Sequence, residues 1–311
     1  MLKLELPSSE KGFSAMMESV DSYLRSEGIP VHARPIRGWI EISKALNLEL
    51  SMFPRNKKRA TEGVYIGDDL SLRIFSWFDE RYGSKLAIRM GPGRAVILVR
   101  GDPWEIHFPR VYGRVEFFIS ANEKSSNQEE DLRLRRIPRC NILDEITDFP
   151  AGLAQSLSRN ELREIGESFV TIFESLESVA GIETLPMVRE VQSDIDSAAS
   201  HLLSNPPHYG LSKWSSLQAV EKSFKVYLAE KDVNIPRHHK LYELSVLAEK
   251  NGMFSVGKDF IDRIQCGASV RYGEELVSKD EAHQAHILSI ILCGRIARDV
   301  SNSIKTKSAD A

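Results

Sequence analysis

The stretch IPRHHKLYEL, residues 235–244, gathers the side chains of this chain that are best suited to bind or move charge. Arg237, His238, His239 and Lys240 follow one another where a helical pattern begins. Arginine holds phosphate through a planar fork of donors, and histidine exchanges protons near neutral pH. The start of a helix favours anions, so a cation there costs roughly 0.3–1 kcal/mol. The cluster therefore needs an explanation.

Two explanations are open from the sequence. In the first, the histidines stay neutral, one of them packs against the protein, and Arg237 and Lys240 point into solvent. In the second, a phosphate or an acidic partner lies at the helix start and offsets the charge. The candidate ligand-binding residues are Arg237, His239, Lys240, Arg271 and Tyr272. The candidate catalytic residues are His238 and His239. We predict no metal site.

Four predicted helical segments in the last third of the chain must position this cluster. They cover residues 211–232, 240–252, 258–273 and 278–305. Ser278 with Glu281 three residues later has the spacing of a capping box, and Ser158 with Glu161 has the same spacing earlier in the chain. Helices of this length with short connections predict an antiparallel bundle. Residues 287–294, ILSIILCG, are apolar around the whole helix. This predicts burial on more than one face and a homodimer formed through the bundle.

Residues 211–302 resemble HEPN domains, small helical bundles named for their occurrence in higher eukaryotes and prokaryotes and for nucleotide binding. The features that carry the resemblance are AVEKSFKVYLAEKD in the first helix, IPRHHKL before the second, VRYG after the third and DEAHQA in the fourth. IPRHHKL is similar to the family pattern P-x-x-H-[DN]-L. His239 and Leu241 fall on family positions, while Lys240 replaces the usual Asp or Asn.

The resemblance implies two functions. Many HEPN domains are metal-independent ribonucleases that act as dimers through an R-x(4–6)-H motif, in which histidine moves a proton and arginine holds the phosphate. That spacing occurs only as Arg25 with His32 and as Arg100 with His107, both outside the bundle. We therefore expect a non-catalytic protein that binds a nucleotide, RNA or protein partner. The alternative is a ribonuclease with a non-standard site that pairs His238 or His239 with an arginine.

Other motifs in the sequence are weaker indications of a functional site. Gly83-Ser84 is not followed by the paired aspartates of a nucleotidyltransferase. His283 and His286 share a helix face but are expected in a solvated first turn rather than at a metal. Asp68 and Asp69 are expected in a hairpin turn, and the basic run at 55–59 in an exposed loop. We expect no cofactor.

The first half of the chain predicts a different architecture. Short β-branched and aromatic runs between residues 63 and 121, separated by Gly and Pro, are typical of antiparallel strands. The predicted fold is α+β, an antiparallel β-rich domain with helices followed by the all-α bundle. The predicted divisions are an α+β domain at 1–122, a polar loop or linker at 123–150, a helical connector at 151–205 and the HEPN-like bundle at 206–311.

Composition limits the class of protein. The chain has 311 residues, 42% of them hydrophobic and 27% charged, with a net charge of −3, as in globular proteins. No apolar run has the length of a membrane helix or a signal peptide. The three cysteines are widely spaced and odd in number, which argues against a disulfide framework. A cytoplasmic location is the expectation.

Overall fold

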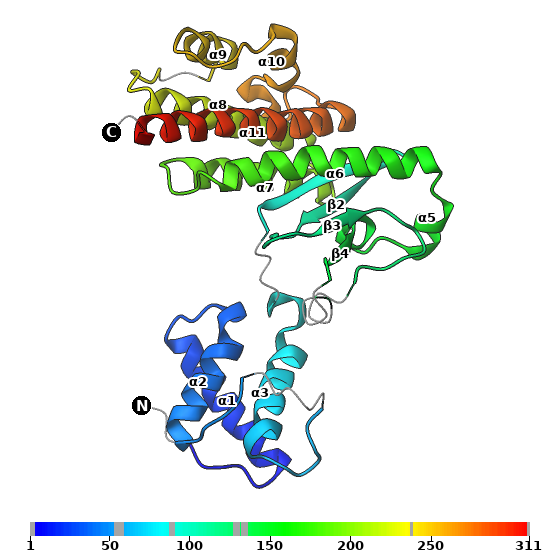
Figure 1. The fold of residues 1–311 in the computed structure, drawn as a ribbon, viewed down its shortest axis with the longest axis vertical. Helices are drawn as coiled ribbons and strands as arrows, with labels where there is room; N and C mark the ends of the chain where they lie inside the picture. Colours follow the sequence, from blue (N-terminus) through cyan, green and yellow to red (C-terminus); the bar gives the residue numbers. More distant parts are fainter. Residues whose placement is uncertain are drawn as a thin grey trace. The chain divides into compact units, whose positions relative to one another are not determined.

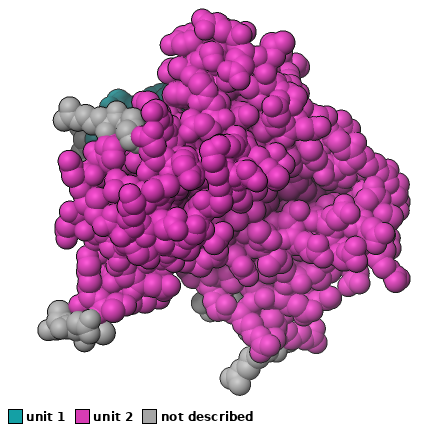
Figure 2. Space-filling view, turned by 90° about the horizontal axis from the view of Figure 1, so that it is seen from above, with its two compact units in different colours: residues 1–89 teal, residues 90–311 magenta. Residues whose placement is uncertain are grey.

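The computed structural model describes residues 4–52, 59–86, 91–126, 131, 136–236 and 239–309. The chain divides into two compact units, Met1–Arg89 and Met90–Ala311. Figure 1 shows the elements of each unit in sequence colours, and Figure 2 shows one face with the larger unit in magenta. Among the described residues, no helix combines the length and apolar character that crossing a membrane requires.

The smaller unit is helical. It contains α1 (Glu10–Ser26), α2 (Arg34–Leu46) and α3 (Gly67–Tyr82), with 3-10 turns η1 (Val31–Ala33) and η2 (Gly83–Leu86). Its core is formed by buried side chains from all three helices, among them Met17, Val20, Ile42, Ile74 and Phe78. Because a Cβ on Gly38 would lie 2.9 Å from the ring of Phe78, the glycine allows α2 to approach α3 closely.

The strands predicted within residues 63–79 are wrong, because α3 begins at Gly67 and the earlier residues of this segment form no strand. Ser71, Ile74 and Phe78 are buried at spacings of three and four residues, while Ser76, which would share a strand face with Ile74 and Phe78, is exposed. This is the periodicity of a helix and not of a strand. Asp68 and Asp69 lie in the first turn of this helix and not in a hairpin turn. Carboxylates stabilise that end of a helix. The basic run at 55–59 lies outside the described residues except for Arg59.

Two later predictions of strands are confirmed. β1 (Gly93–Val99) and β2 (Asp102–Phe108) form an antiparallel hairpin in which Val96 lies opposite Glu105. The predicted strand around residue 117 is a short one, β3 (Glu116–Phe118), which pairs in parallel with β4 (Arg139–Asn141). The chain thus has the predicted α+β class, although its sheets are smaller than the sequence suggested.

The remainder of the larger unit is helical. Its helices are α5 (Ala151–Ser156), α6 (Arg159–Ala180), α7 (Val188–Leu203), α8 (Tyr209–Glu230), α9 (Leu241–Lys250), α10 (Lys258–Ile264) and α11 (Lys279–Ala309), and its 3-10 turns are η3 (Ile142–Glu145) and η4 (Ala268–Tyr272). Both predicted capping boxes are present. The hydroxyl of Ser158 accepts from the N–H of Glu161, and the carboxylate of Glu281 accepts from the N–H of Ser278.

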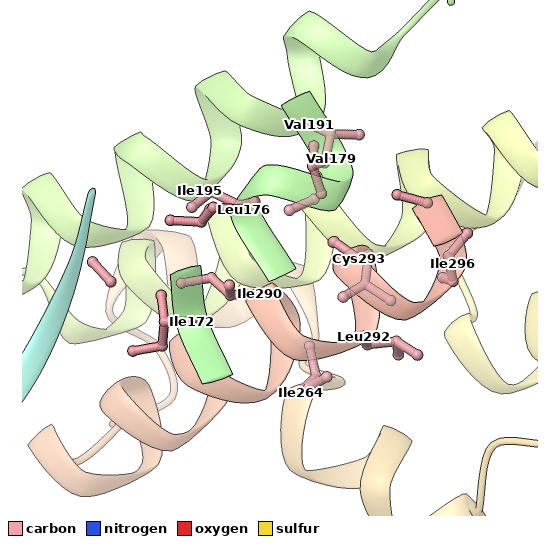
Figure 3. Packing of buried hydrophobic residues seen from close by; sticks show 14 of the residues in the cluster. Ile172, Leu176, Val179, Val191, Ile195, Ile264, Ile290, Leu292, Cys293 and Ile296 are labelled. Carbon is pink, nitrogen blue, oxygen red and sulfur yellow. The ribbon is translucent and has the colours of Figure 1, made fainter. Parts of the chain in front are cut away.

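One hydrophobic core joins the sheet to the long helices. Its buried side chains come from β1, β2 and α6 to α11. Figure 3 shows Leu176 of α6, Ile195 of α7 and Ile290 of α11 pointing toward one another. At the α6–α11 crossing, a Cβ on Gly294 would lie 2.5 Å from the Cα of Ser175. The apolar circumference of α11 is therefore covered largely by helices of the same chain.

This core places the compact units differently from the predicted divisions. The hairpin of β1 and β2, expected with the first 122 residues, belongs to the unit Met90–Ala311. Residues 151–205, expected as a connector, contribute α6 and α7 to the core of the bundle. The hairpin packs against α6, α7 and α11, while α6 packs against α11 and α7 packs against α8. These contacts join segments that are far apart in the sequence.

Candidate binding site on the C-terminal bundle

A polar stripe runs along the otherwise buried helix α8. Its members are Trp214, Gln218, Glu221 and Lys225, spaced by four, three and four residues, so they share one face. Most other positions of this helix are buried. This stripe was not predicted from the sequence. The i, i+4, i+7, i+11 spacing of these polar and aromatic residues was the signal that could have found it.

Glu221 is the centre of the stripe. Its side chain is only 3% exposed, and its two carboxylate oxygens have separate partners. Oε1 accepts from the Nζ of Lys225 at 2.6 Å, and Oε2 lies 2.6 Å from the Nδ1 of His239. A buried carboxylate needs such partners, because removing an ion from water costs several kcal/mol. Glu221 therefore anchors the loop that carries His239 onto α8.

This contact fixes the orientation of the imidazole ring. A carboxylate only accepts hydrogen bonds, so the Nδ1 of His239 carries the proton that it donates to Glu221. The His239 side chain is 62% exposed, and within the described residues its Nε2 has no hydrogen-bond partner. The ring is thus held from one side and open to a ligand on the other.

Aromatic rings and a guanidinium complete the site. The indole of Trp214 lies 6.2 Å from the imidazole of His239, measured between ring centroids. The guanidinium of Arg271 lies 5.1 Å from the Trp214 ring and 5.6 Å from the Tyr272 ring. Tyr272 is 70% exposed. The structure therefore brings together three of the candidate ligand-binding residues, His239, Arg271 and Tyr272, and Trp214 lies between them.

The loop before α9 is held by a side chain from beyond α10. The Oε1 of Gln265 accepts from the N–H of Leu241, the first residue of α9, at 2.9 Å. Its Nε2 donates to the carbonyl of His239 at 3.4 Å. Lys240 is the N-cap residue of α9, but its side chain does not cap the helix. Gln265 does so instead, because it accepts from one of the free N–H groups at the helix start.

The charge at the start of α9 has a partial explanation in these contacts. Lys240 donates to Glu243 in the first turn of the helix, at 2.8 Å. This hydrogen bond raises the pKa of Lys240. His239 donates to Glu221 at 2.6 Å, so each of the two described basic side chains has a carboxylate partner. Arg237 and His238 lie outside the described residues.

The two R-x(4–6)-H pairs have other surroundings. Arg100 follows β1 and donates to Glu161 at 2.7 Å and to the Ser156 carbonyl at 2.7 Å. This ion pair lowers the pKa of Glu161 to about 2. His107 lies in β2, and Arg25 and His32 belong to the smaller unit. None of these residues lies on a helix of the bundle.

His283 and His286 are not in a solvated turn, and this expectation is corrected. The Nε2 of His286 accepts from the N–H of Val96 at 3.2 Å, and the Nε2 of His283 lies 3.0 Å from the Val96 carbonyl. His286 is fully buried, and desolvation lowers its pKa to about 3. The two histidines bind α11 to the edge of β1. The described residues contain no group of three His, Cys, Asp or Glu side chains arranged to hold a metal ion.

Comparison with known families gives one match, in the C-terminal part of the chain. Residues 191–288 match the family model of the HEPN domain, and the N-terminal half has no family match. The resemblance of the C-terminal bundle is therefore confirmed, and the matched region extends it backward into α7. No curated protein and no solved structure matches the chain.

Proposed function

We propose, from the premise that the C-terminal part of this chain carries a HEPN domain, that the bundle binds single-stranded RNA or a nucleotide at the site around Trp214, and does not cleave it. The observation that carries the proposal is the position of Arg271. Its guanidinium lies against the rings of both Trp214 and Tyr272. It presents a cation beside two aromatic faces, which is the combination that phosphate and base require.

Each group has a role in this proposal. Tyr272, 70% exposed, offers a ring face on which a base stacks. Arg271 binds the adjacent phosphate through paired donors. His239 presents its free ring nitrogen to the same ligand, while Glu221 keeps the ring in place. The Arg237 side chain is proposed as a further phosphate ligand, as its sequence position suggests.

A second candidate function, RNA cleavage, is favoured by one observation. The pair of Glu221 and His239 resembles in geometry the carboxylate–histidine pairs that orient a general base, with Nδ1 held at 2.6 Å and Nε2 open. Such a histidine would remove the proton of a 2′-hydroxyl, and Arg271 would hold the phosphate. Binding alone remains the first proposal, because the bundle has no R-x(4–6)-H motif.

We also propose that the protein is cytoplasmic and forms a homodimer through the bundle. HEPN domains often dimerise. Leu288 on α11 is only partly buried within the chain, and the surface around it is the proposed contact. The three cysteines are unpaired, which suits a reducing compartment.

Fluorescence anisotropy with a labelled single-stranded RNA of ten nucleotides, and with labelled ATP, tests the proposal. Replacing Arg271 with alanine should weaken RNA binding by about 10- to 100-fold, since charge-assisted hydrogen bonds contribute about 1.5–3 kcal/mol. Tyr272→Ala should cost about 1–3 kcal/mol through lost stacking. Arg298→Ala, an equal charge change at an exposed position of α11, is the control. Affinity should also fall with added salt.

The same samples separate the two candidate functions. Incubation of the RNA in buffer with EDTA should leave it intact if the site only binds. Cleavage by the unmodified protein that disappears in His239→Ala and in Glu221→Gln would promote the ribonuclease. Equal RNA affinity for the unmodified protein, Arg271→Ala and Tyr272→Ala would remove this site altogether.

A further inference from the structure

A concave surface of the larger unit lies between β1, α6 and α11, and none of the residues just described lines it. We propose that it binds a small amphiphilic cation, an aliphatic body with an ammonium group. The cavity has a volume of about 430 Å³, within the range of roughly 300–1,000 Å³ typical of ligand pockets. Its lining combines an isoleucine floor with a rim that carries excess negative charge.

The floor is aliphatic. It is lined by Ile97 from β1, Ile165 and Ile172 from α6, and Ile287 and Ile291 from α11. The first three are at most 5% exposed, whereas the two from α11 are only partly buried. Part of an apolar surface thus remains in contact with water inside a concavity, and covering it with an aliphatic body is favourable at about 25 cal/mol per Å².

Other groups of the cavity lining are polar and can orient a head group. His283 and His286 of α11 form hydrogen bonds with the backbone carbonyl and N–H of Val96 in β1. Alternate residues of a strand direct their backbone groups to the same edge, so Leu98, which lines the cavity, directs its N–H and carbonyl toward α11 as well. That carbonyl and the hydroxyls of Ser168 and Thr171 are acceptors for an ammonium group.

The charge of the rim selects a cation. Arg100 and Glu161 line the cavity but form an ion pair with each other, so their charges cancel. Glu164 and Glu167 also line it and are exposed on α6. The nearest basic partner of Glu167 is Arg163, at 3.8 Å and with both side chains more than 60% exposed, a pair that contributes little. The rim therefore carries about two uncompensated negative charges.

Isothermal titration of the full-length protein tests this, with n-octylammonium, n-octanol and n-octanoate as probes of equal length and different charge. We expect saturable binding of one octylammonium, weaker binding of octanol and the weakest binding of octanoate. Replacing Glu164 and Glu167 together with glutamine should weaken octylammonium binding about 3- to 10-fold, as expected for two solvent-exposed ion pairs. Octanol affinity should not change.

Glu174→Gln with Glu177→Gln is the matched control. It removes the same charge from the same helix at exposed positions outside the cavity lining, and should leave all three affinities unchanged. Ser168→Trp should fill the cavity and abolish binding of octylammonium and octanol, with the melting curve showing that the fold persists. Equal loss in both glutamine pairs would mean non-specific charge attraction and overturn the proposal. So would octanoate binding as tightly as octylammonium, or octylammonium binding that survives Ser168→Trp.

Discussion

Replacing His286 with glutamine should change how the stability of the larger unit depends on pH. The neutral ring accepts a hydrogen bond from the Val96 N–H at 3.2 Å, and protonation would turn this acceptor into a donor that faces another donor. Burial is the largest cause that lowers the pKa of His286, followed by the positive charges of His283 and Arg94. Glutamine keeps an acceptor for Val96 and removes the titration.

The size of the effect follows from the two pKa values. The pKa of His286 is about 3 in the folded protein, against about 6.5 for an unfolded histidine. Because the pKa is lower in the folded protein, the unfolded state takes up the proton first as the pH falls. The free energy of unfolding is therefore unaffected by the titration of this histidine above pH 6.5 and decreases as the pH falls toward 3. Between pH 7 and pH 5 the unfolded state gains the proton and the folded state does not. The loss over that interval is about 2 kcal/mol.

Urea denaturation at pH 7 and pH 5 measures this loss. Hydrogen exchange followed by mass spectrometry in peptides from β1 and α11 reports the unfolding of the larger unit. Other groups titrate with shifted pKa values in the same unit. The pKa values of His201 and His283 are lowered and those of Asp194 and Asp196 are raised. These groups are present in both proteins, so their contributions cancel in the difference between wild type and variant.

The expected result is that the free energy of unfolding falls by about 2 kcal/mol more in the wild type than in His286→Gln between pH 7 and pH 5. NMR of the imidazole ring gives an independent reading, and His286 should show no titration above pH 4.5. A ring that titrates near pH 6.5, or identical pH profiles for the two proteins, would refute the buried hydrogen bond to Val96.

Further predictions concern packing and assembly. Gly294→Ala should lower the free energy of unfolding by about 1–3 kcal/mol in urea titrations, since its Cβ would lie 2.5 Å from the Cα of Ser175. Gly152→Ala in α5, where a Cβ would meet nothing within 4 Å, should be neutral or stabilising. A fragment of residues 206–311 should melt without cooperativity by circular dichroism, whereas residues 90–311 should melt cooperatively, because α6 and α7 supply part of the core. Light scattering at micromolar concentration should give about twice the 35.1 kDa of one chain, and a mass that stays at one chain would refute the dimer.

Features that depend on neighbouring residues were predictable from the sequence. The capping boxes at Ser158 and Ser278 involve a partner three residues away, so composition and spacing were sufficient to place both helix starts. The strands at 93–99 and 102–108 were also predicted, because β-branched and aromatic residues are dense there. The strand predictions failed at α3, where Ser71, Ile74 and Phe78 carry a helical period within a segment rich in β-favouring residues.

In the candidate site, too, local patterns were predictable from the sequence and contacts between distant residues were not. The sequence by itself determined that the last third forms a HEPN-like bundle and that basic and aromatic residues gather at its helix ends, since these are local patterns. Only the tertiary structure decided that Glu221 on α8 meets His239, 18 residues later, and that Trp214 meets Arg271, 57 residues later. Such contacts depend on how helices pack, and each helix pattern is compatible with several packings. The sequence does not distinguish Glu221 from the other charged residues, whereas the structure shows it buried and in contact with both Lys225 and His239.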